Sequence, residues 1–162
     1  MELFSIRIQR TFQLVSTFNT VFLAFHAAQH YARGLALHHL CDWACLLNRY
    51  GLHIPEEVTD IRFRNMMLAM THLCNDYLGT SVPVYGGEGL AEEILREIIR
   101  PPYTKFVPAK NKWSILVYKT KRMLHTHRAC NSVLRISLCK WVGNSILLHL
   151  RSPYTIFQTE RK

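Results

Sequence analysis

Two stretches of helical apolar spacing meet at a glycine within residues 25–51, FHAAQHYARGLALHHLCDWACLLNRYG, and this arrangement constrains the fold more than any other feature. Apolar side chains recur three and four residues apart on both sides of Gly34, and Gly51 follows the second stretch. Such spacing places apolar side chains on one side of an α-helix, and a glycine after the last turn is typical of a helix C-terminus. The segment is therefore predicted to form a helical hairpin.

The apolar spacing along the rest of the chain predicts an all-α fold, a helical bundle of about six or seven helices. The 7 glycines and 6 prolines are too few for a turn-rich β architecture. Residues 3–9 alternate apolar and polar side chains, which favours a short strand remnant or lead-in within residues 1–16. Such a strand has no partner, so the alternative is that it joins the following helix or frays. The expected helices are residues 17–32, 35–50, a short piece from Pro55, 62–78, 90–99, 112–128 and 131–150.

Charge is distributed unevenly along the chain. Residues 1–81 hold six basic and six acidic side chains, whereas residues 98–162 hold thirteen basic side chains and the single acid Glu160. The proline-containing segment 100–111 is basic and extended in character, so we predict that it links a helical domain, residues 17–99, to a basic amphipathic helical region, residues 112–162.

The basic region indicates an anionic partner: nucleic acid, a membrane surface, a nucleotide or an acidic patch on another protein. The alternative is that its lysines and arginines lie on exposed helix faces and only keep the protein soluble. Aromatic side chains beside basic ones suit base stacking and phosphate contacts, and they equally suit an anionic bilayer surface. The candidate anion-binding residues are Lys119, Lys121, Arg122, Arg128, Arg135 and Lys140.

Cysteine usage and apolar run length indicate the compartment. The 5 cysteines are an odd number scattered along the chain, which does not suggest a disulfide framework and favours a reducing cytoplasm. The longest apolar segment, residues 133–150, is interrupted by Arg135 and Lys140, so we expect no transmembrane segment.

Titratable side chains gather at the hairpin junction, where perturbed functional groups would be expected. His26 and His30 lie one helical turn apart, and a metal would need a third ligand such as His38, His39 or Asp42. This spacing is common in helices, so we expect histidines that pack and hydrogen-bond across the helix pair. We assign no metal ligand and no catalytic residue. The polar cluster comprises His26, His30, Arg33, His38, His39 and Asp42.

Asp42 stands out as one carboxylate within an apolar helical pattern. Burying a carboxylate without a partner is costly, so a hydrogen bond or ion pair to a histidine or to Arg33 is expected. Such a pair would lock the hairpin. The functional alternative is that Asp42 helps to position a nucleotide or an acceptor.

The string LHHLCDWACLL, residues 37–47, has the form leucine-x-x-leucine-x-aspartate-x-alanine-x-leucine-leucine. It resembles the helical segment that follows the catalytic sheet in a large family of poorly characterised bacterial nucleotidyltransferases. Residues 64–79 and 90–99 continue the resemblance less sharply, and it covers about half of the chain.

Nucleotidyltransferases of this superfamily use a glycine-serine turn and two aspartates one residue apart, because two carboxylates hold a divalent metal against the nucleotide phosphates. The sequence has no Gly-Ser dipeptide and no Asp-x-Asp or Asp-x-Glu pair. The resemblance therefore implies the helical accessory part of such a protein, inactive in nucleotidyl transfer on its own. Magnesium and a nucleoside triphosphate are expected only with the missing catalytic domain, which is the implied partner.

Two other interpretations remain. The first is a basic helical module that binds nucleic acid or an anionic surface. The second rests on Arg33 and His38, which resemble the arginine-x4-histidine motif of a helical ribonuclease family. In that family the arginine steadies a phosphate and the histidine moves a proton.

Overall fold

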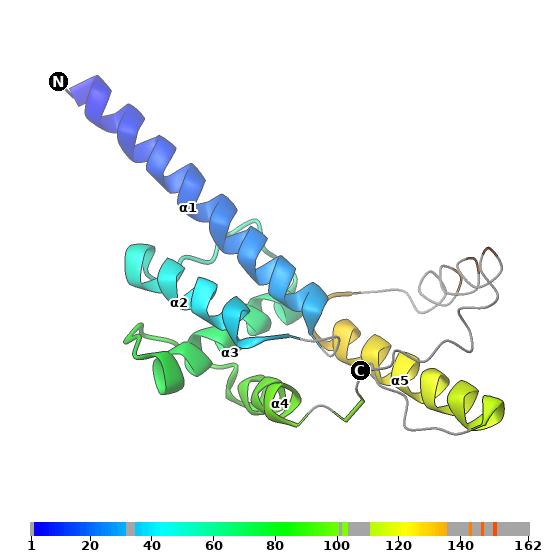
Figure 1. Ribbon diagram of the computed structural model, residues 1–162. Coiled ribbons are helices and arrows are strands. Elements are labelled where there is room, and N and C mark those ends of the chain that lie inside the picture. Colours follow the sequence, from blue (N-terminus) through cyan, green and yellow to red (C-terminus); the bar gives the residue numbers. More distant parts are fainter. Residues whose placement is uncertain are drawn as a thin grey trace.

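The computed structural model describes residues 2–31, 35–100, 102–103 and 111–135 and the single residues 143, 147 and 151, with side chains from residue 15 onward. Within this part of the chain the fold is all-α, as predicted (Figure 1). It contains five helices rather than six or seven. The helices are α1 (Glu2–His30), α2 (Leu37–Tyr50), α3 (Ile61–Leu78), α4 (Glu88–Ile99) and α5 (Lys112–Val133).

Helix α3 occupies the centre of the arrangement, because it packs against all four of the other helices. Helix α1 also packs against α2 and α5. Figure 1 shows α1 as a long rod whose N-terminal half extends beyond the other helices, while α5 projects on the opposite side. The packed core therefore lies where the C-terminal half of α1 meets α2, α3 and α4.

The inward face of α3 builds the centre of the core. The Trp43 indole Nε1 donates a hydrogen bond to the Thr71 hydroxyl at 3.1 Å, and Thr71 in turn donates to the Met67 carbonyl at 2.9 Å. Both polar groups are thereby satisfied inside an apolar interior. The three methionines of α3, Met66, Met67 and Met70, fill this core. The core side chains with at most 2% exposure include Trp43, Met66, Met67, Met70, Leu73 and Ile94.

Local residues explain where the helices begin and end. The Asp60 carboxylate accepts hydrogen bonds from the backbone N–H groups of Arg62 and Phe63, which caps the start of α3. Gly79 follows α3 in the left-handed region at φ 72°, and Gly51 follows α2 at φ 70°. Glycine adopts positive φ without steric cost, and both predicted helix ends are confirmed.

The predicted N-terminal strand is wrong, because residues 3–9 belong to α1. An isolated strand leaves its backbone groups unpaired, whereas a helix satisfies them within the segment. A longer-range pattern also outweighs the short alternation: apolar residues recur at positions 4, 8, 12, 15, 18, 22 and 25. This three-four spacing is helical, and it runs through the whole of α1.

Two other predicted elements also differ. Residues 56 and 57 form a turn, not a short helix, and the Val58 N–H donates to the Pro55 carbonyl at 3.1 Å. Because Asp60 caps α3, the segment before it is too short for a helix of its own. Helix α5 continues past the expected break to Val133, and most of the helix predicted for residues 131–150 lies outside the described residues.

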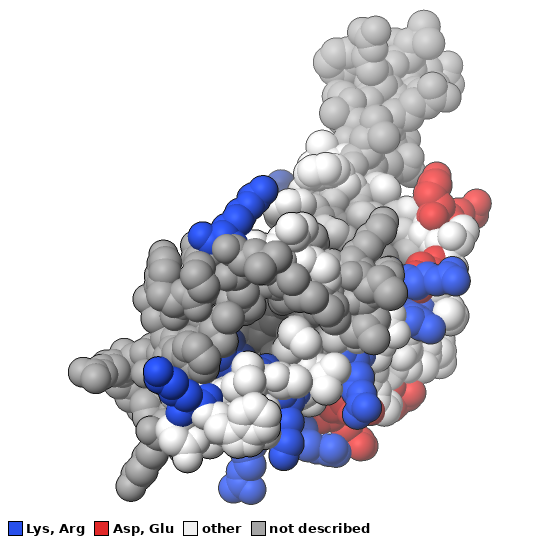
Figure 2. Space-filling view, turned by 90° about the vertical axis from the view of Figure 1, so that its right-hand side faces the viewer, with Lys and Arg blue, Asp and Glu red and all other residues white. Residues whose placement is uncertain are grey.

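Helix α5 joins the core through its C-terminal end. Val133 is fully buried, the Arg62 guanidinium donates to the Asn131 carbonyl at 2.8 Å, and His125 Nε2 lies 2.8 Å from the Glu97 carboxylate. The other end of α5 projects outward, and Figure 2 shows Lys and Arg side chains gathered where it points toward the viewer. The division into domain, linker and basic region stays a prediction.

None of the helices among the described residues has the length and apolar character needed to cross a bilayer.

Gly87, which precedes α4, is predicted to be intolerant of substitution. Its φ is 96°, and a Cβ atom there would lie 2.8 Å from the Ala69 backbone nitrogen. Gly87→Ala should lower the free energy of unfolding by about 1–3 kcal/mol, measured by urea denaturation. Gly89→Ala is the matched control: a Cβ there meets nothing within 4 Å, so this variant should be neutral or more stable. Equal stability of the two variants would contradict the close approach of α4 to α3.

Candidate functional site

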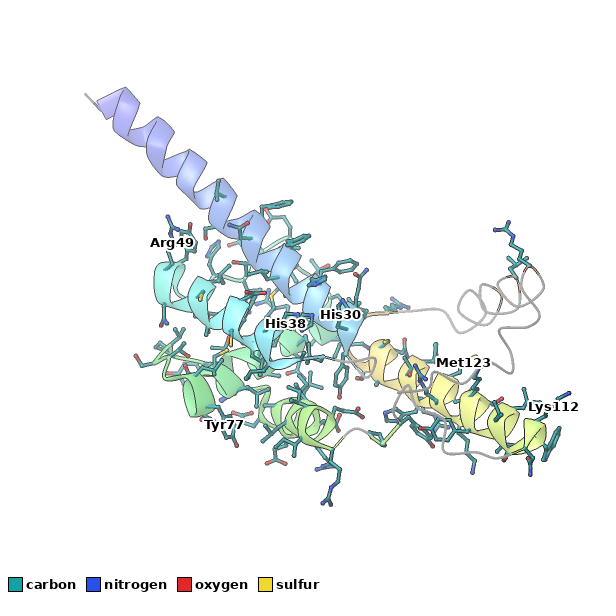
Figure 3. The ribbon with its side chains drawn as sticks, in the orientation of Figure 1. His30, His38, Arg49, Tyr77, Lys112 and Met123 are labelled. Carbon is teal, nitrogen blue, oxygen red and sulfur yellow. The ribbon has the colours of Figure 1, made fainter. Side chains whose placement is uncertain are left out.

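Three histidines meet where α1 ends and α2 begins. His26 and His30 lie one turn apart in α1, and His39 lies in the first turn of α2. The ring centroids are 4.7 Å apart for His26 and His30, 5.2 Å for His26 and His39, and 4.8 Å for His30 and His39. Figure 3 labels His30 and His38 close together at this junction. The histidine rings pack across the helix pair, as expected, and the expected hydrogen bonds across the pair stay a prediction.

The ring nitrogens of this cluster converge on a small volume. One nitrogen from each of His26, His30 and His39 can be chosen so that all three lie within 4.8 Å of one another. His39 is only 4% exposed, and His26 is half-buried. Neutral imidazole nitrogens so arranged can share hydrogen bonds, transfer a proton or coordinate a transition metal.

The orientation of His39 is set by the backbone at the start of α2. Its Nδ1 lies 3.1 Å from the Ala36 nitrogen and 3.2 Å from the Ala36 carbonyl oxygen, so the roles of these atoms depend on the tautomer. Its Nε2 is buried and has no hydrogen-bond partner among the residues that the structure describes. Buried polar atoms are almost always satisfied, so this nitrogen is the chemically exceptional atom of the cluster.

The charge state of His39 follows from its surroundings. Burial lowers the pKa of His39, because the charged imidazolium loses its hydration. The neighbouring His38, His30 and His26 lower this pKa further, while the hydrogen bond to Ala36 acts in the opposite direction. His39 is therefore neutral at physiological pH and available as a hydrogen-bonding group or a metal ligand.

The other predicted members of the polar cluster do not join the three histidines in the same way. His38 is exposed, and its ring stacks on His39 with centroids 3.9 Å apart. Asp42 is exposed and makes no hydrogen bond or ion pair with any described residue, so the expected pairing with a histidine is wrong. An exposed carboxylate keeps its hydration and needs no partner. Arg33 lies outside the described residues.

Helical register separates the buried histidine from its exposed neighbours. His39 shares its face of α2 with Trp43 and Leu46, which are buried, whereas His38 lies with Asp42 and Cys45, which are exposed. Sequence reasoning named both histidines without choosing between them. The positions of Trp43 and Leu46, four and seven residues after His39, were the signal that could have made the choice.

Sequence reasoning also missed the outward face of α1. Val15, Phe18, Phe22 and Phe25 lie on this face and are 48%, 67%, 54% and 45% exposed. Phe18 and Phe22 stack on each other with centroids 6.0 Å apart. The three-four spacing indicated a helix, but a pattern alone does not say whether an apolar face is covered.

Most of the candidate anion-binding residues lie on or beside α5. Lys121 and Arg128 are exposed, and Arg135 follows the end of the helix. Lys119 and Arg122 are half-buried, and Lys140 lies outside the described residues.

No protein-family model, no curated protein and no solved structure matches this chain. The resemblance of residues 37–47 to bacterial nucleotidyltransferases therefore stays a prediction.

The lowered pKa of His39 predicts loss of stability in mild acid. The unfolded chain binds a proton near the ordinary histidine pKa of 6.5, but folded His39 resists it, so acidification below that value favours unfolding. The urea midpoint, measured with EDTA present, should fall between pH 7.5 and pH 5. In His39→Gln this fall should be smaller, whereas His53→Gln, altered at an exposed loop position, should respond like the parent chain. An unchanged pH dependence in His39→Gln would contradict the assignment.

Proposed function

We propose that this chain is a helical accessory module of a nucleotidyltransferase-type protein. It packs against a catalytic domain through the outward face of α1, defined by Val15, Phe18, Phe22 and Phe25, and it does not transfer nucleotides by itself. The observation that carries the proposal is the exposure of these four side chains on one face of one helix. Contiguous exposed apolar side chains mark sites of protein interaction in soluble proteins.

The position of this face suits a docking role. Phe25 contacts Phe63 of α3 edge to face, with centroids 6.4 Å apart, so the row starts at the core. It then continues outward along α1 toward the half of the helix that extends beyond the bundle (Figure 1). Apolar residues at a regular three-four spacing are the pattern by which one helix packs along another. A catalytic domain that presents a helix or a flat apolar surface would cover this row.

The segment that resembles the nucleotidyltransferase family supports a scaffold role. Residues 37–47 form most of α2, and the pattern positions Leu40, Ala44, Leu46 and Leu47 are buried in the core. Four of the pattern positions are therefore packing positions, whereas Leu37 and Asp42 are exposed. The sequence has no Gly-Ser dipeptide and no Asp-x-Asp or Asp-x-Glu pair, which supports the accessory role.

Introducing a negative charge on the outward face of α1 tests the proposal. The chain is mixed with a catalytic domain from the same genome that carries the glycine-serine turn and paired aspartates, and binding is measured by calorimetry. Phe18→Glu and Phe22→Glu should each weaken binding by at least about tenfold, because each removes a large apolar contact. Their melting temperatures should stay unchanged, since both side chains are exposed.

The matched control is Tyr85→Glu, which places the same charge on an exposed aromatic residue of the loop before α4. It should leave the affinity unchanged. Equal affinity of the parent chain, Phe18→Glu and Phe22→Glu would contradict the docking role. Metal-dependent labelling of an acceptor from a nucleoside triphosphate by the purified chain alone would contradict the accessory role.

A second candidate function is binding of an anionic partner through α5. The observation that favours it is charge: the helix contains Lys112, Lys119, Lys121, Arg122 and Arg128 and no acidic residue. Figure 2 shows Lys and Arg side chains gathered around its outer end, with Asp and Glu along one side of that face. Basic side chains that contact phosphates release counterions, so such binding weakens steeply with salt.

Neutralising α5 tests this second function. Lys121→Gln and Arg128→Gln should each weaken binding to a single-stranded oligonucleotide and reduce the slope of log affinity against log salt by about 1. Arg49→Gln, which removes an exposed charge from α2, is the control and should keep the parent slope. Anionic vesicles bound in place of the oligonucleotide would identify a membrane surface. If binding to the oligonucleotide and to the vesicles changed neither with salt concentration nor with these substitutions, the result would contradict the function.

A further inference from the structure

We propose that His26, His30 and His39 bind one Zn²⁺ ion between α1 and α2, with a fourth coordination position open to water or to an exogenous ligand. The inference is independent of the proposed accessory role. It rests on the geometry of the three side chains and on the unsatisfied nitrogen of His39. The sequence alone favours histidines that only pack together. The positions of their ring nitrogens in the structure are what favour a metal site.

The donor set selects the class of metal. All three side chains offer imidazole nitrogen, which suits zinc, copper, nickel and iron, whereas magnesium and calcium require oxygen ligands. The neighbouring Asp42 is exposed and is not part of the converging group. The site is therefore chemically distinct from the magnesium site of nucleotidyl transfer. Zinc is the metal that three-histidine sites with one open position hold in proteins.

The distances are close to those that a tetrahedral site needs. Zinc–nitrogen bonds of about 2.0–2.1 Å at tetrahedral angles place the ligand nitrogens about 3.4 Å apart. The three nitrogens here already lie within 4.8 Å of one another. His26 and His30 come from successive turns of one helix, so their separation is set by the helix itself. Binding of the ion would require side-chain rotation to close the remaining gap.

His39 has the environment of a metal ligand. Its Nδ1 lies 3.1 Å from the Ala36 nitrogen and 3.2 Å from the Ala36 carbonyl oxygen, so the neutral ring either accepts from the Ala36 N–H or donates to the carbonyl oxygen. A metal-binding histidine typically donates its second ring N–H to such an oxygen, and we assign His39 this tautomer in the metal-bound state. That tautomer leaves a lone pair on Nε2, the buried atom without a hydrogen-bond partner. A bound metal would satisfy this atom. A cluster of histidines that only pack together leaves it unsatisfied inside the protein.

The location also gives the metal a structural consequence. Two ligands come from the end of α1 and one from the start of α2, so the ion would tie the two helices together at their junction. Ligand binding to the folded state alone raises stability in proportion to the logarithm of the free metal concentration. Metal binding and thermal stability should therefore change together.

The test uses the untagged full chain after removal of metal with a chelator. Calorimetric titration with Zn²⁺ should show one saturable site for each chain. Co²⁺ in place of Zn²⁺ should give the intense visible absorption of four-coordinate cobalt. His39→Gln and His26→Gln should each lower Zn²⁺ affinity by more than about 100-fold, since loss of an outer-shell partner alone costs about 10–100-fold.

Two controls separate this site from adventitious binding. His38→Gln removes the exposed histidine that stacks on His39, and the double variant Cys41→Ser and Cys45→Ser removes two exposed thiols one turn apart. Both should bind Zn²⁺ as the parent chain does. His26→Gln keeps the test valid if His39→Gln does not fold, because His26 is only half-buried. Absence of a saturable Zn²⁺ site in the parent chain would overturn the proposal. A loss of Zn²⁺ affinity in His38→Gln or in the cysteine variant as large as that in His39→Gln would also overturn it.

Discussion

The indole of Trp43 and the hydroxyl of Thr71 form a hydrogen bond at the centre of the molecule, where both side chains are fully buried. An unpaired indole N–H in this apolar interior would cost about 1–3 kcal/mol. The hydrogen bond therefore favours the register of α2 on α3 that places Trp43 beside Thr71. The same register places His39, one turn before Trp43, on the side of α2 that faces α1. The convergence of the three histidines thus depends on a hydrogen bond between two other residues.

The prediction of helices from sequence was most accurate where the signals are local. The ends at Gly51 and Gly79 are encoded by single glycines whose positive φ needs no tertiary information. The N-terminal strand was wrong because the alternation in residues 3–9 is short, while the helical spacing that overrides it spans 22 residues, from position 4 to position 25. The length of α5 was misjudged for a related reason: residues 129–131 contain no glycine or proline that would end a helix, and the predicted break had no physical cause.

The candidate site was predictable in its members but not in its geometry. Sequence analysis named His26, His30 and His39, yet it could not know that the packing of α1 against α2 brings one ring nitrogen of each within 4.8 Å of the others. Asp42 illustrates the opposite case. Its position within an apolar segment suggested burial. The residues of this segment lie on different faces of α2, however, and Asp42 lies on the exposed face. Burial is a property of the whole fold, and one helix carries only part of that information.

The overhang of α1 has a mechanical consequence. A segment of 14 residues, Glu2 to Val15, spans about 20 Å at the rise of an α-helix, and Figure 1 shows this end of α1 reaching past the bundle. A rigid rod held at one end acts as a lever. A tilt of about 10° at the base would move the far tip by about 3.5 Å. A change in the packing of His26 and His30 that tilted α1 would therefore move its distant end farther than it moved the histidines.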